Sequence, residues 1–156
     1  MASDYLDGKR RSLEQAALTN VVAANAINRD AIIEFLDQFE MPNAITVLRR
    51  EPKDNAILFA NLAFTKHYMG SRPQLLLSTA IDFVCRRMAV VEYVRRFIDR
   101  LFADGRSAGR ISTYTSDRRR YLTNVTSYRF RGFDNDDYAL SFIEPLREVT
   151  RRRRRG

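Results

Sequence analysis

Three runs rich in β-branched and aromatic residues occupy the last third of the chain, and only short polar segments separate them. The runs are RISTYTS at 110–116, RYLTNVTSYRFRG at 120–132 and DYALSFIEPL at 137–146, with SDRR and FDND between them. Residues of these types favour strands, and connections this short join neighbouring antiparallel strands. This part of the chain therefore predicts three consecutive antiparallel strands.

The middle of the chain adds a hairpin and several helices. AITVLRRE (44–51) and AILFA (56–60) indicate two short strands, with PKDN as the turn. Short helical pieces are expected at 61–68 and 74–84, and a longer helix at 88–103 that ends before Gly105, since glycine is favoured after a helix C-terminus. The order of helix, two strands, several helices and three strands predicts an α+β fold, a five-stranded antiparallel sheet with helices over one face.

A long helix is expected before the first strand. Ser12 and Gln15 have the spacing of a capping box, and residues 13–39 contain neither proline nor glycine. Apolar residues surround so much of this helix that one packing partner would not cover them, so we expect homodimerisation or docking on another chain. The expected interface residues are Leu13, Ala17, Val21, Ala24, Ile32 and Phe35. In the alternative, one long or two shorter helices pack only on their own domain.

The length and composition bound the domain organisation. The 156 residues, 45% of them hydrophobic, suffice for one domain with a core. We expect a flexible N-terminus at 1–11, a helical cap and dimerisation segment at 12–40, the domain at 41–150 and a basic tail at 151–156. The apolar stretches are shorter than the roughly 20 residues that cross a bilayer, and the start lacks the apolar region of a signal peptide. A cytoplasmic protein without a membrane span is therefore expected.

Metal binding and catalysis find little support in the sequence. Cys85 and His67 are the only cysteine and histidine, so neither an intramolecular disulfide nor the usual multi-ligand zinc or iron pattern is available. We expect His67 to be a surface or boundary residue and Cys85 to be a small packing residue. No P-loop, nucleophile elbow or HExxH motif is present, and the carboxylates are scattered. We therefore expect no metal and no enzymatic activity.

The positive charge of the chain is concentrated after its last apolar residue. Of the net charge of +8, five come from one run, which consists of Arg151, Arg152, Arg153, Arg154 and Arg155. Consecutive arginines can neutralise phosphates, so a protein that binds nucleic acid or an anionic membrane is the alternative function. Interleaved aromatic residues are absent, and stacking on single-stranded bases is not indicated. A solvated end explains the run more simply, and nucleic acid is not the expected partner.

Two separated motifs resemble those of the PAS family of sensor and interaction domains. The first motif of the family resembles ANLAF at 60–64, followed by SR at 71–72 and LL at 75–76. The closing motif resembles SFI at 141–143, followed by REVTRR at 147–152. Asn61 is expected to cap the next helix, Ala63 to allow close approach to the sheet and Phe64 to enter the core. Glu148 and Thr150 are expected to fix how the chain leaves the sheet.

The resemblance implies that a small molecule can lie between sheet and helices. The alignment puts Ala80 where flavin-binding relatives have their reactive cysteine, and the helix at 88–103 lacks the histidine of haem-binding relatives. Flavin and haem are therefore not expected, and no cofactor is predicted. The candidate polar contacts for an organic ligand are Tyr114, Asn124, Tyr128 and Ser141, which are alternatively ordinary sheet residues with satisfied hydrogen bonds.

The resemblance also implies a function. We expect a sensory or adaptor domain that regulates a signalling partner, such as a kinase or a response protein, by protein-protein interaction, with or without a bound small ligand. The N-terminal helix and the exit joint at 148–150 are expected to carry the signal. Such coupling requires two states that differ in affinity for the ligand or partner.

Overall fold

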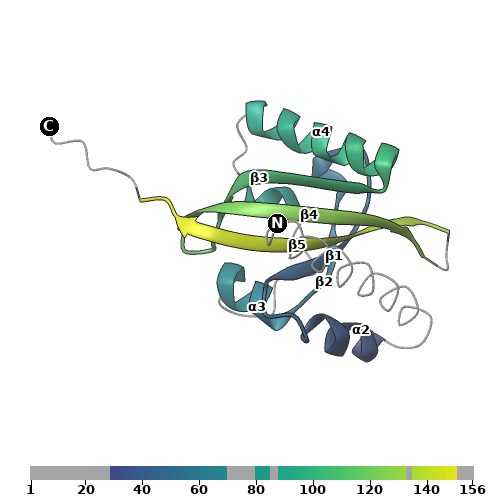
Figure 1. Cartoon of the computed structure of the whole chain (residues 1–156), viewed down its shortest axis with the longest axis horizontal. Helices are drawn as coiled ribbons and strands as arrows, with labels where there is room; N and C mark the ends of the chain where they lie inside the picture. Colours follow the sequence, from purple (N-terminus) through teal and green to yellow (C-terminus); the bar gives the residue numbers. More distant parts are fainter. Residues whose placement is uncertain (1–28, 70–79, 85–87, 133–134, 151–156) are drawn as a thin grey trace, which may run out of the picture.

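The computed structural model of the chain describes residues 29–69, 80–84, 88–132 and 135–150. Its centre is a five-stranded antiparallel sheet in the order β2-β1-β5-β4-β3, which runs from bottom to top in Figure 1. The five strands are β1 (Asn43–Val47), β2 (Ile57–Ala60), β3 (Arg106–Tyr114), β4 (Arg120–Arg131) and β5 (Asp137–Glu148). The predicted sheet is confirmed, and the last strand of the described chain lies at its centre.

Helices connect the two-stranded and three-stranded parts of the sheet. They are α3 (Leu62–Phe64), the π-helical turn η2 (Thr65–Met69), the 3-10 turn η4 (Ala80–Phe83) and α4 (Met88–Asp104). The 3-10 turn η1 (Pro52–Asp54) lies within the hairpin, between β1 and β2. α4 ends as predicted, because Gly105 has a φ of 75° and its N–H donates to the carbonyl of Leu101. Residues 61–68 form no continuous α-helix, and of the second expected piece the structure describes only residues 80–84.

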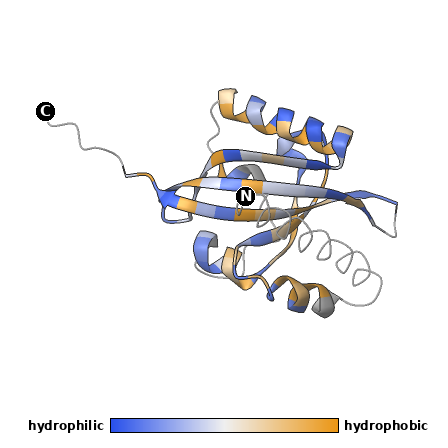
Figure 2. Cartoon of the chain, viewed as in Figure 1, coloured by the Kyte–Doolittle hydropathy of each residue, from blue (hydrophilic) through white to orange (hydrophobic). Residues whose placement is uncertain are grey.

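Alternation along the strands gives the sheet two covered faces. On the inner face, Ala44 of β1 packs with Ile57, Phe64 and Tyr68, while Ala139 of β5 packs with Ile98 and Leu101 of α4. On the outer face, Ile45, Leu140 and Phe142 pack with helix α2 (Arg29–Leu36). Because successive side chains of a strand point to opposite faces, each central strand contributes to both layers. Figure 2 shows apolar and polar residues alternating along α4, as expected for a helix with one packed side.

The N-terminal helix differs from the prediction in where it ends. Its described part, α2, ends at Leu36 rather than at Phe39, and it covers the face of the sheet opposite α4. After Leu36 the chain turns, with N–H groups of Gln38 and Phe39 bonded three residues back. The turn is fixed because the carbonyl of Leu36 accepts from two buried asparagine side chains, described below. Residues 13–28 of the predicted helix lie outside the described residues.

Candidate ligand cavity and its connections

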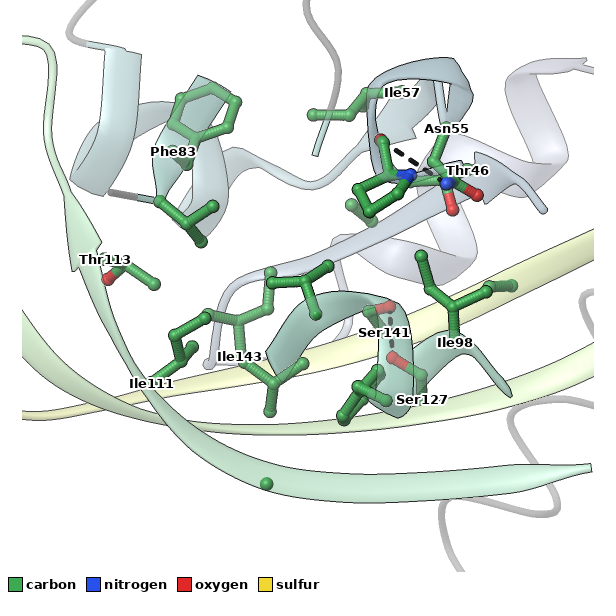
Figure 3. A pocket seen from close by; sticks show the side chains of 18 of the residues that line it. Thr46, Asn55, Ile57, Phe83, Ile98, Ile111, Thr113, Ser127, Ser141 and Ile143 are labelled. Carbon is green, nitrogen blue, oxygen red and sulfur yellow. Dashed lines mark hydrogen bonds between the residues drawn. The ribbon is translucent and has the colours of Figure 1, made fainter. Parts of the chain in front are cut away.

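An apolar cavity of about 140 Å³ lies between the inner face of the sheet and the helices (Figure 3). Its walls come from all five strands and from η1, α3, η2, η4 and α4. The apolar side chains that Figure 3 labels there are Ile57, Phe83, Ile98, Ile111 and Ile143. Gly109 also lines it, and a Cβ at this position would lie 2.3 Å from the Tyr93 hydroxyl oxygen. Glycine in mid-strand thus leaves room for Tyr93 of α4.

Serine side chains form the polar part of one wall. Ser127 of β4 and Ser141 of β5 stand opposite each other, and their Oγ atoms share a hydrogen bond of 2.6 Å that Figure 3 marks. On the side of β4 away from β5, Ser107 of β3 pairs in register with Ser127, and Ser107 is 4% exposed. The Ser107 Oγ has no hydrogen-bond partner among the described residues. The serine row therefore has unused hydrogen-bonding capacity at Ser107.

A second polar chain crosses the inner face towards the β3–β4 turn. The hydroxyl of Tyr68 lies 2.9 Å from Oγ1 of Thr113, which lies 2.8 Å from Oγ1 of Thr123. Burial raises the pKa of the Tyr68 hydroxyl, and the bonds to the two threonines oppose this shift. Tyr68 is 1% exposed, so these bonds satisfy a phenol that would otherwise be buried without a partner.

The structure corrects the predicted set of polar pocket residues. Of the four, only Ser141 lines the cavity between sheet and helices. Tyr128 belongs to the outer core cluster with Phe142, Asn124 lines a depression on the outer face, and Tyr114 follows the inward-facing Thr113. Both faces of β4 and β5 carry apolar and hydroxyl side chains, so the sequence did not show which face is inward. Ser127, which lines the cavity, was missed, although it alternates in phase with the cavity residue Val125 of its own strand.

The described cavity residues offer no partner to a flavin phosphate or a haem iron, and the absence of a cofactor stays a prediction. No charged side chain, histidine, cysteine or methionine lines the cavity among the described residues, so neither a phosphate nor a haem iron finds a partner there. The volume is also below the roughly 300 Å³ at which pockets for larger organic ligands begin. Cys85 lies outside the described residues.

Asn61 ties the crossover to the N-terminal helix. Its side chain is fully buried, and its Oδ1 accepts from the backbone N–H groups of Asn43 and Phe64, each at 3.0 Å. Its Nδ2 lies within hydrogen-bond distance of the carbonyl oxygens of Leu36 (3.2 Å), Phe39 (3.2 Å) and Met41 (2.9 Å). The predicted cap of α3 is thus confirmed, and the same side chain also holds the loop between α2 and β1. We call these contacts the asparagine joint.

The other residues of the two motifs take simpler positions. Phe64 is 2% exposed and packs in the core, as predicted, and Ala63 is half-buried. Glu148 and Thr150 are exposed, and neither side chain has a hydrogen-bond partner among the described residues. The exit from the sheet is instead fixed by backbone, because the Val149 N–H donates to the Arg120 carbonyl at 2.8 Å. The strand pairing makes the predicted side-chain contacts unnecessary.

The residues predicted for a dimer interface divide into two groups. Leu13, Ala17, Val21 and Ala24 lie outside the described residues. Ile32 is 2% exposed in the outer core cluster, and Phe35 packs against that cluster. The Ile32 side chain is therefore covered by its own domain and offers no surface to a second chain. Homodimerisation stays a prediction.

His67 lies at a boundary, as expected, and makes aromatic contacts there. Its ring packs edge-to-face against Tyr68 and Tyr121, with centroids 4.5 Å away in each case. Its buried Nε2 has no hydrogen-bond partner among the described residues. Burial lowers the pKa of His67 from its ordinary value of 6.5, and the charge of Asp117 in the β3–β4 turn acts in the opposite direction.

We expect this burial to make stability depend on pH below about 6.5. Since the folded-state pKa is the lower one, the unfolded chain takes up a proton first, and the free energy of unfolding falls as the pH drops from 6.5 towards the folded-state pKa. Chemical unfolding of the chain and of His67→Phe, which keeps an aromatic ring, measures this between pH 5 and 7.5. His67 is the only histidine, so equal pH slopes in the two proteins would contradict the prediction.

Solved structures of other proteins have the same fold as this chain. The chain aligns with a PAS domain from Colwellia psychrerythraea (TM-score 0.60, 16% identity, 76% of this chain and 94% of the other). It also aligns with a PAS domain from Desulfitobacterium hafniense (TM-score 0.58, 18% identity, 72% of this chain and 99% of the other). A PAS domain from a two-component sensor histidine kinase aligns with a TM-score of 0.56 and 13% identity, over 74% of this chain and 91% of the other. No protein-family model matches the chain, and no curated protein matches its sequence.

The chain thus has the fold of a PAS domain, a fold typical of sensory and signalling proteins. The resemblance inferred from the two motifs is confirmed at the level of the fold. No helix within the described residues has both the length and the apolar character needed to cross a bilayer.

Proposed function

We propose that the chain is a cytoplasmic sensory or adaptor domain that regulates a signalling partner through protein-protein contact, without enzymatic activity of its own. The observation that supports this most is the apolar cavity beside the serine row, within a fold used for sensing. The ligand alters the domain, and the altered domain binds its partner differently. Homodimerisation through residues 13–28 is part of this proposal.

The ligand that suits the cavity is small, neutral and largely apolar. An apolar cavity of about 150 Å³ is large enough to hold benzene, so about 140 Å³ accommodates a molecule of similar size. A charged group would be desolvated there without a counter-charge among the described lining residues. Ser127 and Ser141 have hydroxyl groups that can bond to one polar atom of the ligand.

The asparagine joint provides a route from the cavity to the N-terminal helix. Ala44 and Phe64 line the cavity. Asn43 directly precedes Ala44, and the Asn61 side chain accepts a hydrogen bond from the Phe64 N–H. The same joint bonds to the carbonyl of Leu36, where α2 ends. A ligand that displaces Phe64 would therefore strain the bonds that hold α2. For this coupling the ligand must bind the two arrangements with different affinity.

The test uses three probes of similar size, namely benzene, phenol and benzoate. We expect phenol to bind more tightly than benzene, because its hydroxyl can bond to the serines, and we expect no detectable binding of the charged benzoate. At a free concentration ten times its Kd, phenol should raise the free energy of unfolding by about 1.4 kcal/mol. Unfolding curves measure this effect, and hydrogen exchange of the α2 amides with and without phenol measures the coupling.

Two matched variants locate the binding. Ile111→Phe adds volume to the cavity wall, whereas Leu122→Phe makes a similar change in a half-buried residue that does not line the cavity. We expect only Ile111→Phe to abolish the stabilisation by phenol. Equal binding of phenol and benzoate, or unchanged phenol binding in Ile111→Phe, would contradict the proposed ligand site. Unchanged α2 exchange on phenol binding would contradict the coupling.

A further inference from the structure

Helix α4 packs tightly on the sheet at one end and loosely at the other. In its last two turns Ile98 and Leu101 are 6% and 2% exposed, and both belong to a core cluster of the inner face. In its first two turns the residues that line the cavity, Tyr93 and Val94, are only half-buried. The side chain of Met88, where the helix begins, is 83% exposed. The packing of α4 therefore weakens towards its N-terminal end.

The polar contacts of α4 follow the same gradient. At the C-terminal end the Arg129 guanidinium donates to the carbonyl of Phe102 at 2.9 Å and lies over the Phe102 ring. The backbone N–H of Arg129 donates to the carbonyl of Gly105, also at 2.9 Å. At the other end, Tyr93 forms the one hydrogen bond that joins residues 88–94 to the sheet among the described residues. A single side chain therefore holds the first half of the helix by a polar contact.

The Tyr93 hydroxyl reaches the outer edge of the sheet. β3 is the edge strand, and α4 runs along it in Figure 1. At the two ends of β3, Gly105 and Thr115 form backbone hydrogen bonds across the β3–β4 ladder, and the register between them is continuous. The odd-numbered residues therefore bond to β4, and the N–H of Arg110 points away from it. The Tyr93 hydroxyl oxygen accepts a hydrogen bond from this N–H at 3.1 Å.

Gly109 makes room for this contact and lies beside it. A Cβ at Gly109 would lie 2.3 Å from the Tyr93 hydroxyl oxygen, 3.2 Å from Cζ of Tyr93 and 3.5 Å from Cδ2 of Phe97. Gly109, Tyr93 and Phe97 all line the cavity, and Arg110, the next residue of the strand, is exposed. The two rings of α4 therefore close the cavity at the edge of the sheet, where a residue with a side chain would keep them away.

We propose that Tyr93 is the latch of an entrance to the cavity, and that the first half of α4 moves away from β3 to admit the ligand. This entrance rests on the proposed function, because it serves the same cavity. Opening breaks one hydrogen bond, and the released N–H of the exposed Arg110 bonds to water instead, so no polar group is left buried without a partner. The C-terminal half, held by Arg129, is the fixed end of this lid.

The rates of ligand entry and release test the latch. Tyr93→Phe removes the hydroxyl and keeps the ring, and fluorine NMR measures the exchange of para-fluorophenol between its free and bound states. We expect association and dissociation both to become roughly 2- to 12-fold faster, which is the effect of one hydrogen bond of ordinary net strength, and Kd to stay within about twofold. The matched control is Tyr114→Phe, because Tyr114 of β3 is also half-buried but does not line the cavity. Its rates should equal those of the unchanged chain.

Hydrogen exchange of the Arg110 amide tests the latch without a ligand. Gly109→Ala places a methyl group where the Tyr93 hydroxyl lies, so the hydroxyl must leave the Arg110 N–H. We expect Gly109→Ala and Tyr93→Phe each to speed this exchange by roughly 2- to 12-fold. In the double variant the obstructing oxygen is absent, so the two effects should not multiply.

The outcomes separate the latch from the ligand site. If the unchanged chain does not bind para-fluorophenol, the proposed ligand site fails, and the entrance fails with it. If the probe binds but its rates are the same in Tyr93→Phe, or change equally in Tyr114→Phe, only the latch is overturned. Unchanged exchange of the Arg110 amide in Tyr93→Phe, or effects that multiply in the double variant, would overturn the latch whether or not the probe binds.

Discussion

Replacing Asn61 by alanine is expected to lower the free energy of unfolding by about 3 to 5 kcal/mol. The side chain is 0% exposed, and its removal leaves two backbone N–H groups and three backbone carbonyls, at the end of α2 and in the α2–β1 loop, without this partner. Each buried polar group that loses its partner costs about 1–3 kcal/mol. Urea unfolding followed by circular dichroism measures the change.

A matched asparagine provides the control for this substitution. Asn124 is half-buried on the outer face, and its Oδ1 accepts from Nε of Arg110 at 3.1 Å. We expect Asn124→Ala to cost less than about 1 kcal/mol, since water can replace an exposed bond. If Asn61→Ala were no more destabilising than Asn124→Ala, the asparagine joint would not hold α2 and the crossover together.

Replacing Leu36 by alanine is expected to cost about 3 kcal/mol. The Leu36 side chain is 0% exposed and packs in the outer core cluster with Ile45, Leu140 and Phe142. Its truncation removes apolar contacts and leaves a cavity that the sheet cannot fill. Urea unfolding measures the loss, and faster hydrogen exchange in α2 would show where it acts.

The same helix offers a control one turn away. Ile33 is half-buried and lines a shallow depression on the surface with Glu34 and Asp37. We expect Ile33→Ala to cost less than about 1 kcal/mol and both variants to keep the oligomeric mass of the unchanged chain. A change of mass in Leu36→Ala without loss of stability would show that Leu36 contacts a second chain rather than its own sheet.

Local signals in the sequence predicted much of the fold. The five strands are marked in the sequence by local runs of β-branched and aromatic residues. The glycine after α4 and the cap at Asn61 depend only on neighbours a few residues away. For that reason their positions could be predicted to within a few residues. The order of elements then restricted the arrangement to a sheet with helices packed on it.

Long-range pairing decides the rest, and it could not be predicted from local patterns. The register of three strands places the serine row, Ser107, Ser127 and Ser141, side by side. Asn61 was predicted as a cap, but its bonds to the α2–β1 loop join residues about 20 to 25 positions apart. Each of these features requires knowledge of the tertiary structure.

The sheet order has a consequence for how the chain folds during synthesis. The β1–β2 hairpin emerges from the ribosome early, but β5 lies between β1 and β4 and is made last among the strands. Until residues 137–148 are available, the hairpin and the β3–β4 ribbon each have an edge without a partner, and unpaired edges favour aggregation. The domain is therefore expected to complete its fold in one late step, in which β5 inserts between the β1–β2 hairpin and the β3–β4 ribbon.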